Sequence, residues 1–100
     1  MFRILYSRKA SQDLNNLFQT IIVNYQAPET AYRYTQEIID TIKSIAKAPE
    51  IYAIQTRRSL QKYGYNVRRV NYKKMAIIYT VYDNVVLIHR IVPSALITEL

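Results

Sequence analysis

The first quarter of the chain changes its pattern of apolar residues at Ser7. In residues 2–6, large apolar side chains occupy every second position, which is typical of a short β-strand. From Arg8 onward the apolar residues recur at intervals of three and four, and this spacing predicts a helix over residues 8–25 with the Ser7 hydroxyl as its N-cap. The apolar stripe of this helix comprises Ala10, Leu14, Leu17, Phe18, Ile21, Ile22 and Tyr25.

A second apolar stripe predicts another helix that begins at Pro28. Proline suits the first turn of a helix because its missing N–H would be unpaired there, and Lys43 and Lys47 suit the negative end of the helix dipole. Pro49 prevents continuation much beyond Ala48. The two helices are therefore predicted to form an antiparallel hairpin. The second stripe comprises Ala31, Tyr34, Ile38, Ile42, Ile45 and Ala46.

The last third of the chain has the pattern of three strands, over residues 65–72, 75–82 and 85–92. The nearly unbroken apolar run in 75–82 favours a central position in a sheet. Residues 49–64 show no sustained period and include the only glycine of the chain. They are predicted to form a mobile connection that leads into the first of these strands.

A two-residue turn at 83–84, with the sequence Asp-Asn, joins the last two predicted strands. Both residue types tolerate the positive φ that such a turn requires. Counting outward from the turn places His89 opposite Ile78 and Arg90 opposite Ile77. Because neighbouring residues of a strand alternate, His89 and Arg90 are predicted to point to opposite faces of the sheet.

These elements give an α+β fold with the order β-α-α-β-β-β, in which the helical hairpin packs on one face of an antiparallel sheet. The opposite face is then at least partly free. One hundred residues is the length of one ordinary domain, so a single domain over residues 1–100 is expected.

The composition narrows the class of function. Half of the residues are apolar and cysteine is absent, which predicts a folded, soluble chain in a reducing compartment, the cytoplasm, without a membrane span. A single histidine cannot build an ordinary zinc site, and a single glycine excludes the glycine-rich phosphate loops. We therefore expect no metal or nucleotide cofactor.

The positive charge is concentrated. The net charge is +7, and residues 57–74 hold seven of the fourteen lysines and arginines without any acidic residue. This clustering favours a negatively charged partner over a role in solubility alone. The seven basic residues, predicted to bind a target or a nucleic acid, are Arg57, Arg58, Lys62, Arg68, Arg69, Lys73 and Lys74.

Two chemical interpretations of this stretch stay open. Tyr63, Tyr65 and Tyr72 lie among the basic residues, where they could stack on unpaired bases or contact a protein. RNA cleavage without a metal needs only cations and proton transfer, so Arg69 (or its neighbour in the strand) could hold a phosphate while His89 acts as acid or base. The simpler interpretation, which we favour, is that His89 is a half-buried strand residue.

The order of elements and the segment NVRRVNYKKMAIIYTVYDNVVLIHRIV, residues 66–92, resemble the RelE/ParE superfamily, the toxins of bacterial type II toxin–antitoxin modules. The segment ETAYRYTQEIIDTIKSIAKAPEI, residues 29–51, adds to this resemblance. The resemblance implies a small acidic antitoxin as partner, a role in plasmid stabilization and growth arrest, and a homodimer or a heterotetramer with the antitoxin.

Two targets are known in this superfamily. RelE-like members cleave ribosome-bound mRNA as metal-independent endoribonucleases, and ParE-like members inhibit DNA gyrase without catalysis. In the nuclease pattern Arg69 matches one basic position, but Ala76 and Ala95 stand where arginines belong. The VRRV segment at 67–70 and the APE after the second helix resemble the ParE branch, although the tail PSALITEL lacks its usual His and Arg. The resemblance slightly favours gyrase over mRNA, with a non-toxic antitoxin-binding relic as a third alternative.

Overall fold

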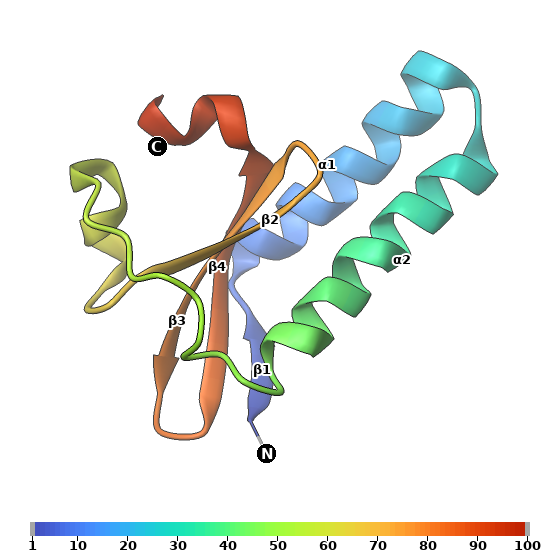
Figure 1. The fold of residues 1–100 in the computed structure, drawn as a ribbon. Coiled ribbons are helices and arrows are strands. Elements are labelled where there is room, and N and C mark those ends of the chain that lie inside the picture. Colours follow the sequence, from blue (N-terminus) through green and yellow to red (C-terminus); the bar gives the residue numbers. More distant parts are fainter. Residues whose placement is uncertain (1, 100) are drawn as a thin grey trace.

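A computed structural model describes residues 2–99, and the order of its elements confirms the predicted α+β fold (Figure 1). Two long helices form a hairpin on one side of a four-stranded sheet, and two 3₁₀ helices lie near the other side. The elements are β1 (Arg3–Tyr6), α1 (Arg8–Tyr25), α2 (Pro28–Ile45), η1 (Arg58–Tyr63), β2 (Arg68–Tyr72), β3 (Met75–Tyr82), β4 (Val85–Pro93) and η2 (Ser94–Glu99).

The sheet has the strand order β1-β4-β3-β2. Strands β2, β3 and β4 pair antiparallel, as predicted, whereas β1 joins the sheet parallel to β4. A parallel pair needs a long connection, and residues 7–84 supply it. The sheet is therefore mixed instead of antiparallel throughout, and β4 lies between the first and the third strand of the chain.

The helix boundaries follow the predicted stop and start residues. The Ser7 hydroxyl accepts a hydrogen bond from the Ala10 N–H at 2.9 Å, which confirms it as the N-cap of α1. Helix α1 ends where Gln26 adopts a left-handed φ of 49°, and α2 begins with Pro28 in its first turn. Helix α2 ends at Ile45, a little earlier than expected, because the chain turns before Pro49.

The segment 49–64 has more structure than its sequence pattern predicts. It contains η1, whose Leu60 is fully buried, and the Gln55 N–H donates to the Val67 carbonyl at 2.7 Å. Strand β2 begins three residues later than predicted because Asn66 takes a positive φ of 53° in a turn. A 3₁₀ helix of six residues is too short to show a sustained period, so the pattern did not reveal it.

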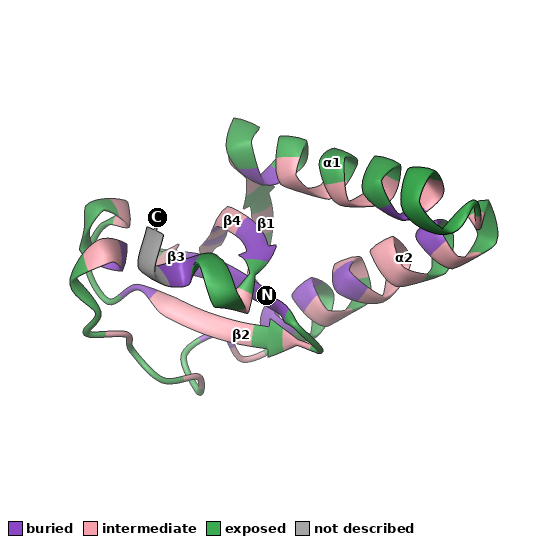
Figure 2. Cartoon of the chain, turned by 90° about the horizontal axis from the view of Figure 1, so that it is seen from above, coloured by how far each residue is buried: buried purple, intermediate pink, exposed green. Residues whose placement is uncertain are grey.

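Two apolar clusters pack on opposite faces of the sheet, and Figure 2 shows the buried stretches of β3 and β4 between them. The larger lies under the helical hairpin, and the smaller lies under η1 and η2, so the second face is partly covered. The larger cluster comprises Ala10, Ile38, Ile42, Ile45, Met75, Ile77, Tyr79, Val86, Ile88 and Ile91. The smaller comprises Leu60, Val67, Ala76, Ile78, Val92 and Ile97.

A β-bulge in β4 corrects the predicted register. Tyr79 opposes Ile88, but the next residue of β3, Ile78, opposes Arg90, so His89 is the extra residue. The predicted pairs Ile78 with His89 and Ile77 with Arg90 are therefore wrong by one position. The alternation is interrupted as well, because Ile88 and Ile91 both belong to the cluster under the helices although they are three residues apart.

Candidate functional site

The structure places five of the seven basic residues of 57–74 at the two ends of β2 and the other two within the strand (Figure 1). Arg57, Arg58 and Lys62 are exposed in and beside η1, before the strand begins. Lys73 and Lys74 form the turn after it, where the Lys73 ammonium lies 5.5 Å from the centroid of the Tyr34 ring and 5.4 Å from that of Tyr72. The basic stretch is thus two separate cationic groups with a strand between them.

The strand itself carries two arginines with different surroundings. Arg68 is half-buried, and its guanidinium donates hydrogen bonds to the backbone carbonyls of Glu50 and Tyr52. The buried hydroxyl of Tyr79 donates to the neighbouring Pro49 carbonyl at 2.6 Å, and burial raises the pKa of Tyr79 to about 12. Both side chains hold the segment that follows α2, so the guanidinium of Arg68, which was predicted to bind a target, makes structural contacts instead.

Arg69 lies on the face of the sheet opposite to the helices. It opposes Ile78, which belongs to the smaller apolar cluster, and its Nε donates to the side-chain oxygen of Asn71 at 2.9 Å. Strand β3 separates Arg69 from His89, since the strand order places β2 and β4 on its two sides. The two residues predicted to cooperate in RNA cleavage therefore lie on non-adjacent strands.

His89 is a half-buried strand residue, as the simpler interpretation held. Its Nε2 lies 2.8 Å from the Thr80 hydroxyl, and its ring packs on Tyr63 of η1 with 5.1 Å between centroids and 37° between planes. Burial lowers the pKa of the imidazole from its ordinary value of 6.5. His89 is consequently neutral near pH 7, which suits a proton acceptor more than a cation for phosphate.

An ion pair that sequence reasoning missed lies beside His89. Arg90 donates from Nε and Nη2 to the two carboxylate oxygens of Asp13 at 2.8 and 3.1 Å, and the Ile91 N–H donates to the same carboxylate at 2.9 Å. The hydrogen bond to Asp13 is the main reason why the pKa of Arg90 is raised. The guanidinium nearest to His89 in sequence is therefore neutralised by α1.

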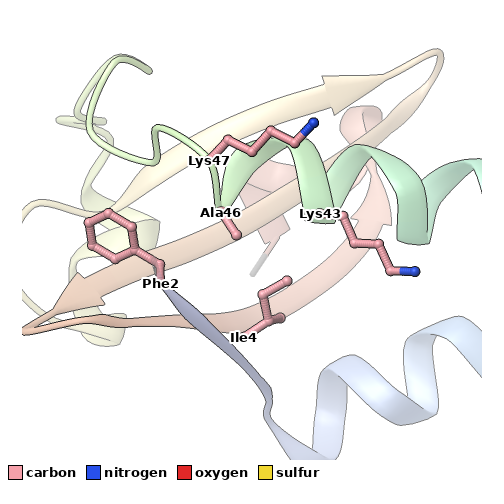
Figure 3. Close-up of a pocket in the computed structure, with 5 residues that line it drawn as sticks. All are labelled: Phe2, Ile4, Lys43, Ala46 and Lys47. Carbon is pink, nitrogen blue, oxygen red and sulfur yellow. The ribbon is translucent and has the colours of Figure 1, made fainter.

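A second surface is an apolar groove between β1 and α2 (Figure 3). Phe2 and Ile4 line it from the strand side and Ala46 from the helix side, and they enclose a cavity of 510 Å³. The stems of Lys43 and Lys47 border the cavity while their ammonium groups point outward. An adjoining cavity of 450 Å³ shares Ile4 and Lys43 and extends the groove towards α1.

The fold is that of a toxin class known from other proteins. The family model described as the ParE toxin of the type II toxin–antitoxin system parDE matches residues 4–95, and the chain belongs to this family. No curated protein matches the chain at a significant level. Among the described residues, no helix is long and apolar enough to cross a membrane.

The structure is also similar to a solved chain from the chromosomal ParDE toxin–antitoxin system of P. aeruginosa. The two share 21% sequence identity, the alignment covers 93% of this chain and 96% of that chain, and the TM-score is 0.76. At this level of identity the likeness establishes the fold, and the membership of the toxin family rests on the family model.

Proposed function

We propose that this toxin arrests growth by inhibiting DNA gyrase without catalysing a reaction. The observation that carries the proposal is that Arg69 and His89, the pair considered for RNA cleavage, lie on non-adjacent strands, while the neighbouring arginines make structural contacts. Arg68 holds two backbone carbonyls, Arg90 is paired with Asp13, and His89 is engaged by Thr80. General acid–base catalysis contributes about 10²- to 10⁴-fold in rate, and here it would depend on one half-buried imidazole.

Cleavage of ribosome-bound mRNA is the second candidate. It is favoured by the lowered pKa of His89, since a neutral imidazole beside a hydroxyl can accept a proton. Arg69, the basic residue that matches the nuclease pattern, lies on the same face but two strands away. In this mechanism Arg69 would hold the phosphate and His89 would act as the base.

Induced expression with a DNA-damage reporter, primer extension of mRNA and a supercoiling assay with purified protein distinguish the candidates. We expect growth arrest with induction of the DNA-damage response, intact mRNA in primer extension, and inhibition of gyrase supercoiling by the purified protein. Discrete codon-phased mRNA cuts that disappear in His89→Ala would instead establish the nuclease. Normal growth with retained binding of a cognate antitoxin would identify a non-toxic relic.

We also propose that an acidic antitoxin docks in the groove between β1 and α2. The groove is apolar inside and bordered by Lys43 and Lys47, which suits an amphipathic segment with acidic residues at its margins (Figure 3). Strand β1 is an edge of the sheet, and its outer side pairs with no other described strand, so an extended segment can add to it. A disordered antitoxin tail that folds on binding would cover both features.

A further inference from the structure

A small hollow lies at the end of β3 that β2 does not cover, and its inner wall, Tyr63, packs against the smaller apolar cluster. Its volume is 210 Å³, and Tyr63, Tyr65 and Tyr82 line it together with Gly64, Thr80 and Val81. Tyr65 is 95% exposed and Tyr82 is 80% exposed, so two of the three aromatic side chains are largely open to solvent. Strand β2 pairs with β3 only as far as Tyr79, which leaves the last three residues of β3 beside the loop that carries Tyr65.

The charges around the hollow are mainly positive. The Lys62 ammonium lies 5.4 Å from the centroid of the Tyr63 ring, and Arg57 and Arg58 are exposed at the start of the same 3₁₀ helix. The one acidic neighbour along β3 is Asp83, in the turn after Tyr82. Among the described residues that line the hollow, none is acidic. A ligand in the hollow would therefore contact aromatic rings and lie near basic side chains.

We propose that this hollow binds an unpaired base of a single-stranded nucleic acid, whose phosphates follow the cations of η1. A base offers a flat apolar face for stacking on tyrosine while its backbone carries the charge that the arginines attract, and this combination is the usual design of single-strand binding surfaces. A duplex hides these faces within its stack. The ring of Tyr63 is already held against His89 at 5.1 Å, so the inner wall of the hollow is fixed before a base arrives.

The site concerns a ligand and a surface other than the antitoxin groove, and it does not depend on the choice between gyrase and mRNA. Fluorescence anisotropy with labelled ten-nucleotide oligo(dT) and oligo(rU) tests it, with a duplex of the same length as comparison. We expect both single strands to bind more tightly than the duplex, and their ratio to show whether DNA or RNA is preferred. If the wild-type protein binds the oligonucleotides but does not inhibit gyrase, the proposed target is refuted and the proposed nucleic-acid site is retained.

Variants of the two exposed tyrosines separate stacking from charge. Tyr65→Ala and Tyr82→Ala should each weaken binding at least about fivefold, while Tyr65→Phe and Tyr82→Phe retain it, because stacking needs the ring and not the hydroxyl. Tyr25→Ala, at the tip of the helical hairpin and 72% exposed in the native protein, is the matched control and should bind like the wild type. Arg57→Gln combined with Arg58→Gln should reduce the salt dependence of the affinity for the single strands, because fewer phosphates are then neutralised.

Three results would overturn the proposal. One is binding of the duplex as tight as that of the single strands, and another is unchanged affinity in both alanine variants. The third is competition by poly-L-glutamate as strong as that by oligo(dT) at equal charge, since this would reduce the surface to a site for any polyanion. Both tyrosines are exposed, so circular dichroism of the variants should match that of the native fold and leave the comparison valid.

Discussion

The imidazole of His89 owes its position to the β-bulge in β4, in which His89 is the extra residue. Without the bulge, the alternation of the strand would continue and His89 would oppose Ile78. With it, the ring meets Tyr63 from η1 and the Thr80 hydroxyl from β3, while Arg90, the charged neighbour in the strand, turns to Asp13. No residue that faces His89 in these contacts is an acid, so burial is free to lower its pKa.

This burial predicts a pH dependence of stability. The folded protein holds the pKa of His89 below its ordinary value of 6.5. At a pH between the pKa of the folded chain and that of the unfolded chain, the unfolded chain therefore binds more protons. The free energy of unfolding should therefore decrease as the pH falls below about 6.5. Urea unfolding between pH 5 and 8 measures it. His89→Gln, which does not titrate, should show a smaller decrease in this window, and an identical slope would contradict the prediction.

The two adjacent arginines of β2 should respond differently to the same substitution. Arg68→Ala removes hydrogen bonds from a charged donor to two carbonyls, so we expect a loss of roughly 1–3 kcal/mol in the free energy of unfolding. Arg69→Ala removes one exposed contact to Asn71 and should cost under about 0.5 kcal/mol. Denaturant titration of both variants measures the difference. Equal losses would mean that the contacts of Arg68 contribute nothing beyond those of a surface residue.

At the scale of elements, the long periodic segments could be predicted from the sequence. Helix α1 and strand β3 have the expected bounds, because eighteen and eight residues, respectively, are enough to show a period and both end at residues that break it. The bulge and η1 were missed. Each is decided by tertiary packing: Leu60 buries itself on the second face, and nothing local in β4 marks His89 as the extra residue.

The sequence indicated which residue types belong to the candidate site but not which of these residues lie together in space. Residue type identified the cations of 57–74 and His89, but the geometry divides the cations into two groups and assigns Arg68 to the backbone. The sequence contained one weak indication that Asp13 pairs with a cation, since it is the only acidic residue before Glu29. A contact across 77 residues of sequence cannot be derived from spacing.

The groove between β1 and α2 gives a prediction at the element scale. Lys43→Glu with Lys47→Glu reverses the charge at its border and should weaken an acidic antitoxin at least about tenfold, because both lysines are exposed and like charges repel. Lys73→Glu with Lys74→Glu makes the same change of net charge at the far turn and is the matched control. Titration calorimetry with a cognate antitoxin measures both. Equal weakening by the two pairs would refute docking in the groove.

At the scale of the whole molecule, the net charge of +7 is distributed over separate surfaces. Lys43 and Lys47 border the groove on the helix side, and η1, which carries cations at its start and at Lys62, ends at the aromatic hollow on the other side of the sheet. An antitoxin in the groove and a nucleic acid at the hollow would therefore occupy different surfaces. The antitoxin would then neutralise the toxin by steric exclusion of the target or through a tail that reaches around the sheet.

The parallel pairing of β1 with β4 also governs when the sheet can be completed during synthesis. The first strand to leave the ribosome has its sheet partner in the last, and Ser7 bonds the carbonyl of His89 across 82 residues of sequence. Domains fold as units, and contacts distant in sequence form late. The nascent chain therefore cannot complete its sheet, or the groove beside β1, until translation reaches β4. We therefore expect a message that is interrupted before β4 to yield a fragment without the complete sheet.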